Sequence, residues 1–488
     1  MRPTRRDTGL VAIGAVVSGG AGFGFTWLLA RASGASGAGI VLTVTTWFTI
    51  LLTLAKAGMD TTLVREGGRI RAGETGVDPV PLLRWTLWPV AAVSAAPGAV
   101  IALAADPIGK WILADSPVSL TPIVVTAGLL LPLAVYTMLQ LAFLRGLGSI
   151  ASYVLIEQVL KPGLRLLGAA VLLFFGVRAA MAYGYAWFLP VFVGATLTSL
   201  IANRARQSWG EGSGENGERA RVWGYARPRA ASQVVDIANV SFGTVTLGVL
   251  STPAETGTFA TALRVVMAGQ LAFQAVRLLI APSLAALLAS ARHRDAQEVF
   301  ATGTSLIVVL AWPAFLICLV FPDLVLGLFG AGFEGASVTL QILSLSGLLL
   351  AVVGNQGSVV LMSGRSRSAL WAVSCGLAAN LVLTLSLVRA WGSNAAALGW
   401  TASVAVEGIY LALVLHREGF RPLPRESMLM ASRLLLTLGA GLVLAKAASG
   451  HGWLSLTLAV VGFLAAIVWA GPHAAREFHT LTRGEIRG

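Results

Sequence analysis

The chain has 488 residues, of which 56% are hydrophobic and only 12% are charged. Soluble globular proteins carry charge on about 25% of their residues, so this composition excludes a soluble domain and indicates a polytopic integral membrane protein. The net charge of +13 would suggest nucleic-acid binding in a soluble protein. Cationic cytoplasmic loops explain such an excess in a membrane protein, so we expect no nucleic-acid partner.

Hydropathy predicts about fourteen transmembrane helices, because one span needs about 20 consecutive apolar residues. A backbone in lipid must satisfy its own hydrogen bonds, so these segments are expected to be α-helical and the fold class all-α. In chain order the predicted spans are 9–30, 38–57, 84–105, 119–144, 150–176, 179–203, 229–250, 256–282, 298–321, 335–361, 367–388, 394–415, 428–447 and 453–471.

The cationic residues predict the orientation of these spans. Of the 35 Lys and Arg residues, 26 lie at the termini and in alternate gaps between spans. The opposite gaps hold five, namely Arg31, Lys110, Arg178, Arg389 and Lys446. Because cytoplasmic loops carry the Lys/Arg excess, this distribution predicts an even number of spans with both termini in the cytoplasm.

One gap differs from all others, since residues 204–228 are polar, glycine-rich and charged. That composition is typical of a flexible linker, here on the cytoplasmic side. It divides the chain into a six-helix bundle (1–203), the linker, a second six-helix bundle (229–416), and two further helices with a cytoplasmic tail (417–488). Similar short Gly/Thr/Ser segments at 32–39 and 252–258 favour a parallel repeat of the two bundles.

No catalytic machinery is recognisable between the spans. The extramembrane regions are too short for a folded catalytic domain, so we expect a transporter rather than an enzyme. No nucleophile elbow, phosphate-binding glycine loop or metal-ligand spacing occurs, and no cofactor is expected. Cys318 and Cys375 lie in apolar stretches and are interpreted as small buried hydrophobic residues.

Three charged residues share one face of the predicted span 150–176. Glu157, Lys161 and Arg165 follow one another at four-residue spacing. A charge facing lipid at mid-bilayer costs at least about 2.5–3.5 kcal/mol, so this face must contact protein or water. Two interpretations stay open: an intrahelical ion-pair ladder near the cytoplasmic interface, or a cationic lining for an anionic substrate.

The predicted span 256–282 holds the other two intramembrane cations, Arg264 and Arg277, with Gln274 between them. Arg264 is interpreted as a cavity residue. Arg277 lies near the inner end, where it either lines the cavity or extends to water.

Two acids lie inside other spans: Asp236 in 229–250 and Glu407 in 394–415. Each is a candidate proton or sodium coupling site, or a counter-ion to an arginine. Asp60, Arg65 and Glu66, where the second span ends, are interpreted as a solvated helix end that anchors the chain at the membrane surface.

Several short segments occur in a characteristic order over the first twelve spans. They are GASGAG at 34–39, AGMDTTLVR at 57–65, LRGLG at 144–148, EQVLKP at 157–162, TGTFATALR at 256–264 and LGLFGAGF at 326–333. Together they resemble the polysaccharide (oligosaccharide) flippases of the multidrug/oligosaccharidyl-lipid/polysaccharide (MOP) exporter superfamily.

This resemblance implies two pseudo-symmetric six-helix bundles around a central cavity, as in the drug-extruding (MATE) branch, with two C-terminal helices added. It implies translocation of undecaprenyl-pyrophosphate-linked oligosaccharide across the bacterial cytoplasmic membrane by alternating access, for cell-surface polysaccharide synthesis. Arg264, Lys161 and Arg165 would then line the cavity. Membrane lipids, a polysaccharide polymerase and glycosyltransferases are the implied partners.

Three alternatives accompany this hypothesis. A cation-coupled multidrug antiporter of the same fold is the main one. A lipid II flippase would carry several arginines in the first bundle, but residues 10–30 contain none. A membrane glycan polymerase would present a long exterior loop, which this sequence does not contain.

Overall fold

The computed structural model describes residues 5–449, apart from 74–77, 114–117, 208–215, 331, 354, 364 and the positions 271–272, 274–275, 278–279, 281–282, 285–286, 289 and 291. Every regular element in this part of the chain is helical. The chain divides into two compact units, Met1–Gly257 and Thr258–Gly488.

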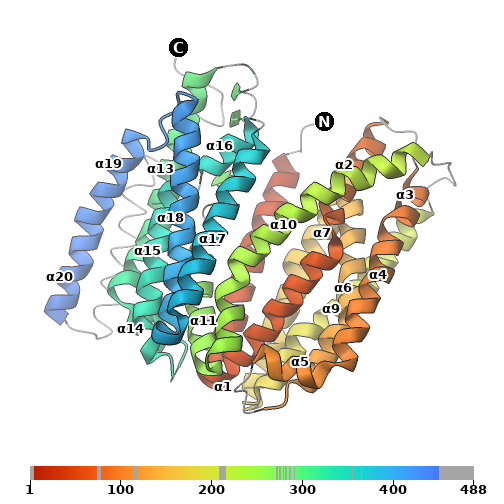
Figure 1. Ribbon diagram of the computed structural model, residues 1–488, viewed down its shortest axis with the longest axis horizontal. Coiled ribbons are helices and arrows are strands. Elements are labelled where there is room, and N and C mark those ends of the chain that lie inside the picture. The colour runs from red at the N-terminus through yellow and green to blue at the C-terminus, as the bar shows by residue number, and fades with distance from the viewer. Residues whose placement is uncertain are drawn as a thin grey trace. The chain divides into compact units, whose positions relative to one another are not determined.

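The first unit is built on two long helices and a set of shorter ones (Figure 1). Its elements are α1 (Arg5–Lys56), α2 (Met59–Ala72), α3 (Pro79–Trp85), α4 (Leu87–Leu103), α5 (Ala105–Ile112), α6 (Thr121–Gly146), α7 (Ile150–Tyr153), the π-helix η1 (Val154–Leu160), α8 (Lys161–Phe174), α9 (Ala180–Arg206) and α10 (Asn216–Leu250). In Figure 1, α4, α6 and α9 lie side by side.

The second unit begins within α11 (Pro253–Gly269). It continues with α13 (His293–Val320), α14 (Pro322–Gly327), the short η2 (Glu334–Ala336), α15 (Ser337–Val353), α16 (Gln356–Met362), α17 (Ser366–Trp391), α18 (Ser393–Arg417), α19 (Arg425–Leu434), the π-helix η3 (Leu435–Gly439) and α20 (Ala440–Ser449). Helix α18 packs against both α15 and α17.

The structure confirms an all-α polytopic membrane protein. Within the described residues, nine helices are long and apolar enough to cross a membrane, or ten if the bent pair α15–α16 forms one span. Two predicted spans, 9–30 and 38–57, appear as the single helix α1, in which only Gly34 leaves helical geometry (φ 68°, ψ −173°). The predicted span 150–176 is divided by η1, and 453–471 lies outside the described residues.

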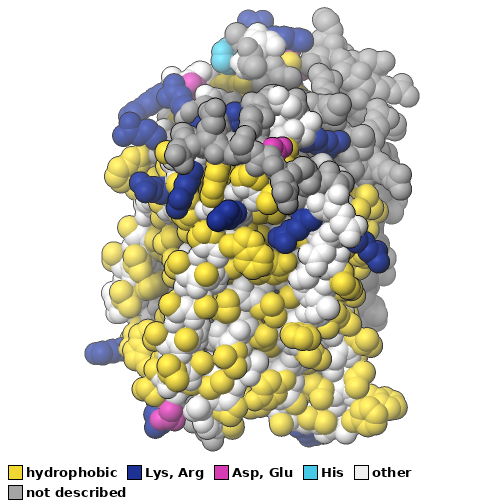
Figure 2. Space-filling model, turned by 90° about the vertical axis from the view of Figure 1, so that its right-hand side faces the viewer, with side chains coloured by type: hydrophobic (Ala, Val, Ile, Leu, Met, Phe, Trp, Pro, Cys, Tyr) yellow, Lys and Arg dark blue, Asp and Glu magenta, His cyan; other side chains and the backbone are white. Residues whose placement is uncertain are grey.

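Apolar side chains also cover much of the outside of the molecule. Figure 2 shows a broad belt of hydrophobic side chains on one face, with most Lys and Arg side chains gathered toward one end of it. Leu103, Phe174 and Leu436 are each more than 70% exposed. A surface of this kind matches the hydrocarbon region of a bilayer rather than water.

Residues 216–228 differ from the expected flexible linker, because they form the first turns of α10. Val222 and Ala226 are fully buried there and pack in one core cluster with Met59 and Leu63 of α2. These two apolar residues are four positions apart and share one face of the helix. That face packs on α2, although the segment as a whole is polar. The expected division into bundles at 1–203 and 229–416 stays a prediction, since compactness groups α10 with the first unit.

The similar segments at 32–39 and 252–258 meet in the first unit. A Cβ atom added to Gly39 would lie 1.8 Å from the carbonyl oxygen of Pro253, and one added to Gly257 would lie 1.9 Å from that of Ala35. Neither position can hold a side chain while α1 and α11 stay in contact, so glycine at both is a packing requirement.

Candidate functional site: a charged group beside apolar pockets

The predicted charged face of residues 157–165 spans a π-helix and the α-helix that follows it, with Glu157 in η1 and Lys161 and Arg165 in α8. Pro162 has no N–H group, and its ring crowds the carbonyl of Gln158 four residues earlier, so a regular α-helix is disfavoured at this point. The chain widens into η1 immediately before Lys161. Such wide turns recur at functional sites in other proteins, and this one carries Glu157.

Glu157 and Lys161 form the ion pair that their spacing predicted. Lys161 Nζ donates to Glu157 Oε1 at 2.6 Å, and the two side chains are only 6% and 13% exposed. The methylene stem of Lys161 passes close to α9, where a Cβ on Gly194 would lie 2.9 Å from its Cδ. Burial strengthens this pair, because water screens it little.

Arg165 lies one turn further along α8, against an aromatic residue of α9. Its Nε donates to the carbonyl oxygen of Trp187 at 3.1 Å, and its guanidinium carbon lies 3.9 Å from the centroid of the Trp187 ring. A cation over an indole face is stabilised by the ring quadrupole. Sequence reasoning missed Trp187, because only the packing of α8 on α9 brings residues 22 positions apart together.

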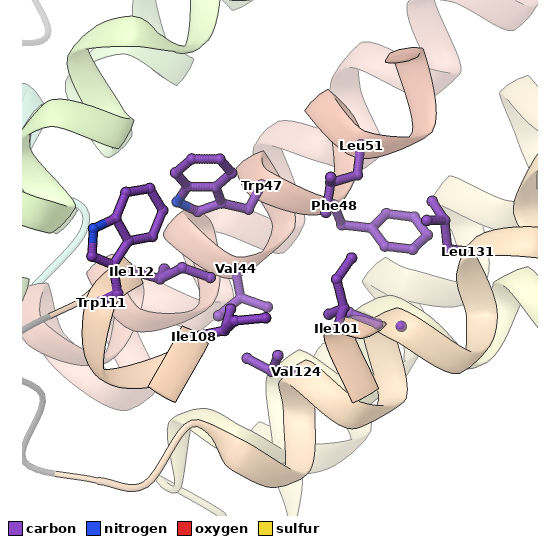
Figure 3. A pocket seen from close by; sticks show the side chains of 12 residues that line it. Val44, Trp47, Phe48, Leu51, Ile101, Ile108, Trp111, Ile112, Val124 and Leu131 are labelled. Carbon is purple, nitrogen blue, oxygen red and sulfur yellow. The ribbon is translucent and has the colours of Figure 1, made fainter. Parts of the chain in front are cut away.

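An apolar cavity of about 200 Å³ lies next to this aromatic contact. Phe48 lines the cavity, and its ring centroid is 5.7 Å from that of Trp187. Figure 3 shows Trp47 and Trp111 together at one end of the cavity and Phe48 directed toward Leu131 at the other. The two indole rings are 5.3 Å apart.

A larger and more open apolar groove of about 650 Å³ runs between α6, α8 and α9. Leu164 and Gly168 of α8 line it, as do Tyr185 and Leu189 of α9. Leu164 and Gly168 flank Arg165 along the helix, so cationic and apolar surfaces adjoin on the same element. This juxtaposition suits a ligand with an anionic group and a long apolar chain.

The candidate residues of the second unit do not gather into a comparable group. Arg264 is exposed on α11, and Gln274 lies outside the described residues. Arg277 is exposed and close enough to Glu407 of α18 for the two charges to attract each other. The counter-ion interpretation of Glu407 thus has structural support, and the cavity role of Arg264 stays a prediction.

Asp236 lies on α10 in the first unit, where its side chain is exposed. Arg229, seven residues earlier on the same helix, attracts its charge. Positions seven apart share one helical face, so this attraction is compatible with a counter-ion role of Asp236, which stays a prediction.

Of the two acids that follow the second predicted span, Glu66 is buried and Asp60 is partly buried, which corrects the expectation of a solvated helix end. Glu66 is 2% exposed and accepts hydrogen bonds from Arg69 (3.1 Å) and from Arg221 of α10 (3.0 Å). Arg65 lies over the ring of Tyr225, with 4.3 Å between its guanidinium carbon and the ring centroid. The missed signal is the polar segment 216–228, which supplies both Arg221 and Tyr225.

Asp60 is the second acid of this group and is partly buried. It accepts hydrogen bonds from Lys56 Nζ (2.9 Å), Gln233 Nε2 (2.9 Å) and the Thr61 backbone N–H (2.7 Å). Burial raises the pKa of Asp60, but the Lys56 charge and these hydrogen bonds together lower it more, so its pKa lies below the ordinary value of 3.8.

No group of three or more His, Cys, Asp or Glu side chains that could hold a metal ion occurs among the described residues. Cys318 is buried and Cys375 partly buried, and neither forms a disulfide. The chemistry of the candidate site therefore comes from its cations and its apolar surfaces.

Neither a protein-family model nor a curated protein sequence matches the chain. Solved structures do match it. The structure of lipid II flippase MurJ in an inward closed conformation is similar with a TM-score of 0.66 at 12% identity, covering 94% of this chain and 98% of that one.

Two further similar structures come from other transporters. The MATE multidrug transporter DinF-BH has a TM-score of 0.60 at 14% identity, covering 85% of this chain and 95% of that one. A MOP superfamily transporter from Pyrococcus furiosus has a TM-score of 0.55 at 14% identity, covering 88% and 99%. The chain therefore has the fold that these MOP superfamily transporters share.

Proposed function

We propose that the protein is a translocase that moves undecaprenyl-pyrophosphate-linked oligosaccharide from the inner to the outer leaflet for cell-surface polysaccharide synthesis. The observation that carries the proposal is the charged group of α8 and η1, in which two cations and one acid lie inside an apolar segment beside apolar pockets. A pyrophosphate needs positive charge in a site of low dielectric constant. A polyprenyl chain needs an apolar surface that is continuous with the bilayer.

The proposed mechanism is alternating access without a covalent step. The lipid-linked substrate would enter sideways, so that its tail stays in the hydrocarbon while the headgroup crosses along the protein. Lys161 and Arg165 would compensate the phosphate charge during the crossing. Similarity in fold to a lipid II flippase supports a lipid-linked substrate as a class.

A cation-coupled multidrug antiporter is the second candidate. The fold is equally shared by MATE transporters, and acids within spans (Asp236 and Glu407) are the groups that a coupling cation would require. An arginine attracts the charge of each acid, which is what a counter-ion role requires, so we place this candidate second.

Reconstitution tests the two candidates side by side. Purified wild-type protein in liposomes is supplied with fluorescent undecaprenyl-pyrophosphate-oligosaccharides that carry different glycans, and transfer between leaflets is measured. Proton-driven exchange of a drug cation is measured in the same vesicles. Transfer of at least one glycan lipid supports the proposal; drug–proton exchange without any such transfer contradicts it.

A further inference from the structure

A polar groove of about 830 Å³ opens in the second unit, between the start of α13 and the segment that leads into α19. Arg294 of α13, Arg421 of the connecting loop and Arg425 of α19 all line it, together with His293. Two acids, Glu298 and Glu426, line it as well. The groove is separate from the charged group formed by Glu157, Lys161 and Arg165, and from the apolar pockets of the first unit.

The three arginines of this groove keep their charge available. Within the described residues, no carboxylate lies within ion-pair distance of Arg294, Arg421 or Arg425, although Glu298 and Glu426 line the same groove. Neighbouring arginines behave differently, since Arg292 pairs with Asp295 at 2.5 Å and Arg365 pairs with Glu418. The three arginines that line the groove can therefore attract an external anion.

Hydrogen bonds fix the walls of the groove. Gln297 of α13 donates from Nε2 to the carbonyl oxygen of Arg421 (3.1 Å) and accepts from the Arg421 N–H at Oε1 (2.8 Å). The buried Ser427 of α19 donates to the carbonyl oxygen of Ala301 (3.0 Å) and lies 3.0 Å from the hydroxyl of Ser305. The connecting loop and α19 are therefore both attached to α13, so that the backbone from which Arg421 and Arg425 extend is fixed beside α13.

Two helices begin at the groove. Helix α13 starts at His293 and α19 at Arg425, and neither has a side-chain cap on its first N–H groups. Pro424, which precedes α19, has no side-chain acceptor for such a cap. Uncapped N-termini carry partial positive charge, which the first-turn acids Asp295 and Glu426 offset in part, so the arginines supply most of the attraction for an anion.

The groove adjoins the first residues of a candidate membrane span. Residues Arg425–Leu444 form one candidate span. Along it Met428, Leu429, Leu435 and Leu436 are between 42% and 72% exposed, as expected for a surface in contact with acyl chains. A ligand in the groove therefore sits at headgroup level, with apolar protein surface immediately below it.

We propose that this groove binds the phosphate of an anionic phospholipid headgroup, with the acyl chains lying along α19. Three unpaired arginines match a phosphodiester, which accepts several charge-assisted hydrogen bonds. A volume of about 830 Å³ is in the range of pockets for whole small-molecule ligands, so it can hold a group larger than one inorganic phosphate. This inference does not depend on the transported substrate.

The test compares lipids in one detergent background. Delipidated protein is titrated with phosphatidylglycerol, phosphatidylcholine or inorganic phosphate, and bound lipid is counted by native mass spectrometry. Wild type should bind phosphatidylglycerol at least about 10-fold more tightly than phosphatidylcholine, and inorganic phosphate should not displace it. Arg421→Ala/Arg425→Ala should abolish this preference, because it removes two of the three groove cations.

Arg367→Ala/Arg417→Ala is the matched control, since it removes two exposed arginines of the same unit that do not line the groove. It should keep the preference for phosphatidylglycerol. An unchanged preference in the groove variant would overturn the proposal. Displacement of the lipid by inorganic phosphate would overturn the assignment to a lipid and indicate a free-phosphate site instead.

Discussion

The first unit contains two groups of charged residues, one around Glu66 and Asp60 and one around Glu157. They differ in which segments of the chain their acids connect. Glu66 joins Arg69 of its own helix to Arg221 of α10, and Asp60 likewise joins Lys56 to Gln233 of α10. Glu157 pairs with Lys161 within one helical turn, and Arg165 packs on Trp187 one helix away. The first group crosslinks distant segments, whereas the second concentrates charge inside an apolar segment.

The difference separates charges that serve the fold from charges that can serve a ligand. In the first group, each acid accepts two or more hydrogen bonds from different elements, which is the pattern of a structural crosslink. In the second, apolar pockets adjoin the cations, which is the surface that a lipid phosphate requires. Substitutions in the two groups should therefore affect different properties: stability in the first, and both stability and transport in the second.

The largest stability effect is expected for Glu157→Gln. It leaves the ammonium of Lys161, whose side chain is 6% exposed, without its carboxylate. Breaking a buried ion pair on one side costs about 3–5 kcal/mol, so the melting temperature in detergent should fall clearly. Glu157→Gln/Lys161→Met removes both charges and should recover most of the loss. A double variant no more stable than the single one would contradict the pairing.

A smaller loss is expected for Glu66→Gln, which weakens the link between α2 and α10. Arg69 and Arg221 are 23% and 33% exposed, so their charges regain water when Glu66 is neutralised. Loss of hydrogen bonds to a charged acceptor costs about 1.5–3 kcal/mol, which thermal unfolding can measure. Asp106→Asn is the control, because its ion pair with Lys110 is exposed and should leave the melting temperature unchanged. Equal losses in both variants would refute the crosslink.

The smallest effect, and the one that depends on pH, is expected for Asp60→Asn. Because the folded-state pKa of Asp60 is lowered, its carboxylate stabilises the protein fully above the ordinary pKa of 3.8, and this contribution is lost as the pH falls through the lower folded-state value. At neutral pH the variant should lose about 1 kcal/mol, since asparagine can keep the Gln233 contact. The gap in melting temperature between wild type and variant should close in acid below 3.8. A gap that stays constant with pH would show that the charge of Asp60 contributes nothing.

Much of the fold could be predicted from the sequence, because each apolar stretch of span length must become a helix in lipid. Two features of the fold were not predicted from hydropathy, because each is decided by one or two residues. The gap between the first two spans became one kinked helix, since only Gly34 departs from helical geometry. Residues 216–228 were predicted as a linker from their polar composition, but Val222 and Ala226 fix them on α2.

The candidate site was predictable only where it is local. Four-residue spacing predicted the contact between Glu157 and Lys161, because that distance follows from helix geometry alone. The contact of Arg165 with Trp187 joins residues 22 positions apart, and that of Glu66 with Arg221 joins residues 155 positions apart. Both contacts depend on how the helices pack, which the pattern of a single sequence does not reveal.

The central claim is that the cations of the candidate site meet the phosphate of the substrate. The most direct test is the flipping rate of the charge-neutral variant Glu157→Gln/Lys161→Met/Arg165→Met. It is measured in the liposome assay with the glycan lipid that wild type transfers. The control, Asp106→Asn/Lys110→Met/Arg178→Met, removes the same number of charges outside the candidate site. At equal amounts of folded protein, the first variant should flip at least about 10-fold more slowly than wild type, because a charge-assisted contact to phosphate contributes about 1.5–3 kcal/mol. The control should match wild type. Wild-type rates in the first variant would contradict the claim that these cations meet the phosphate of the substrate.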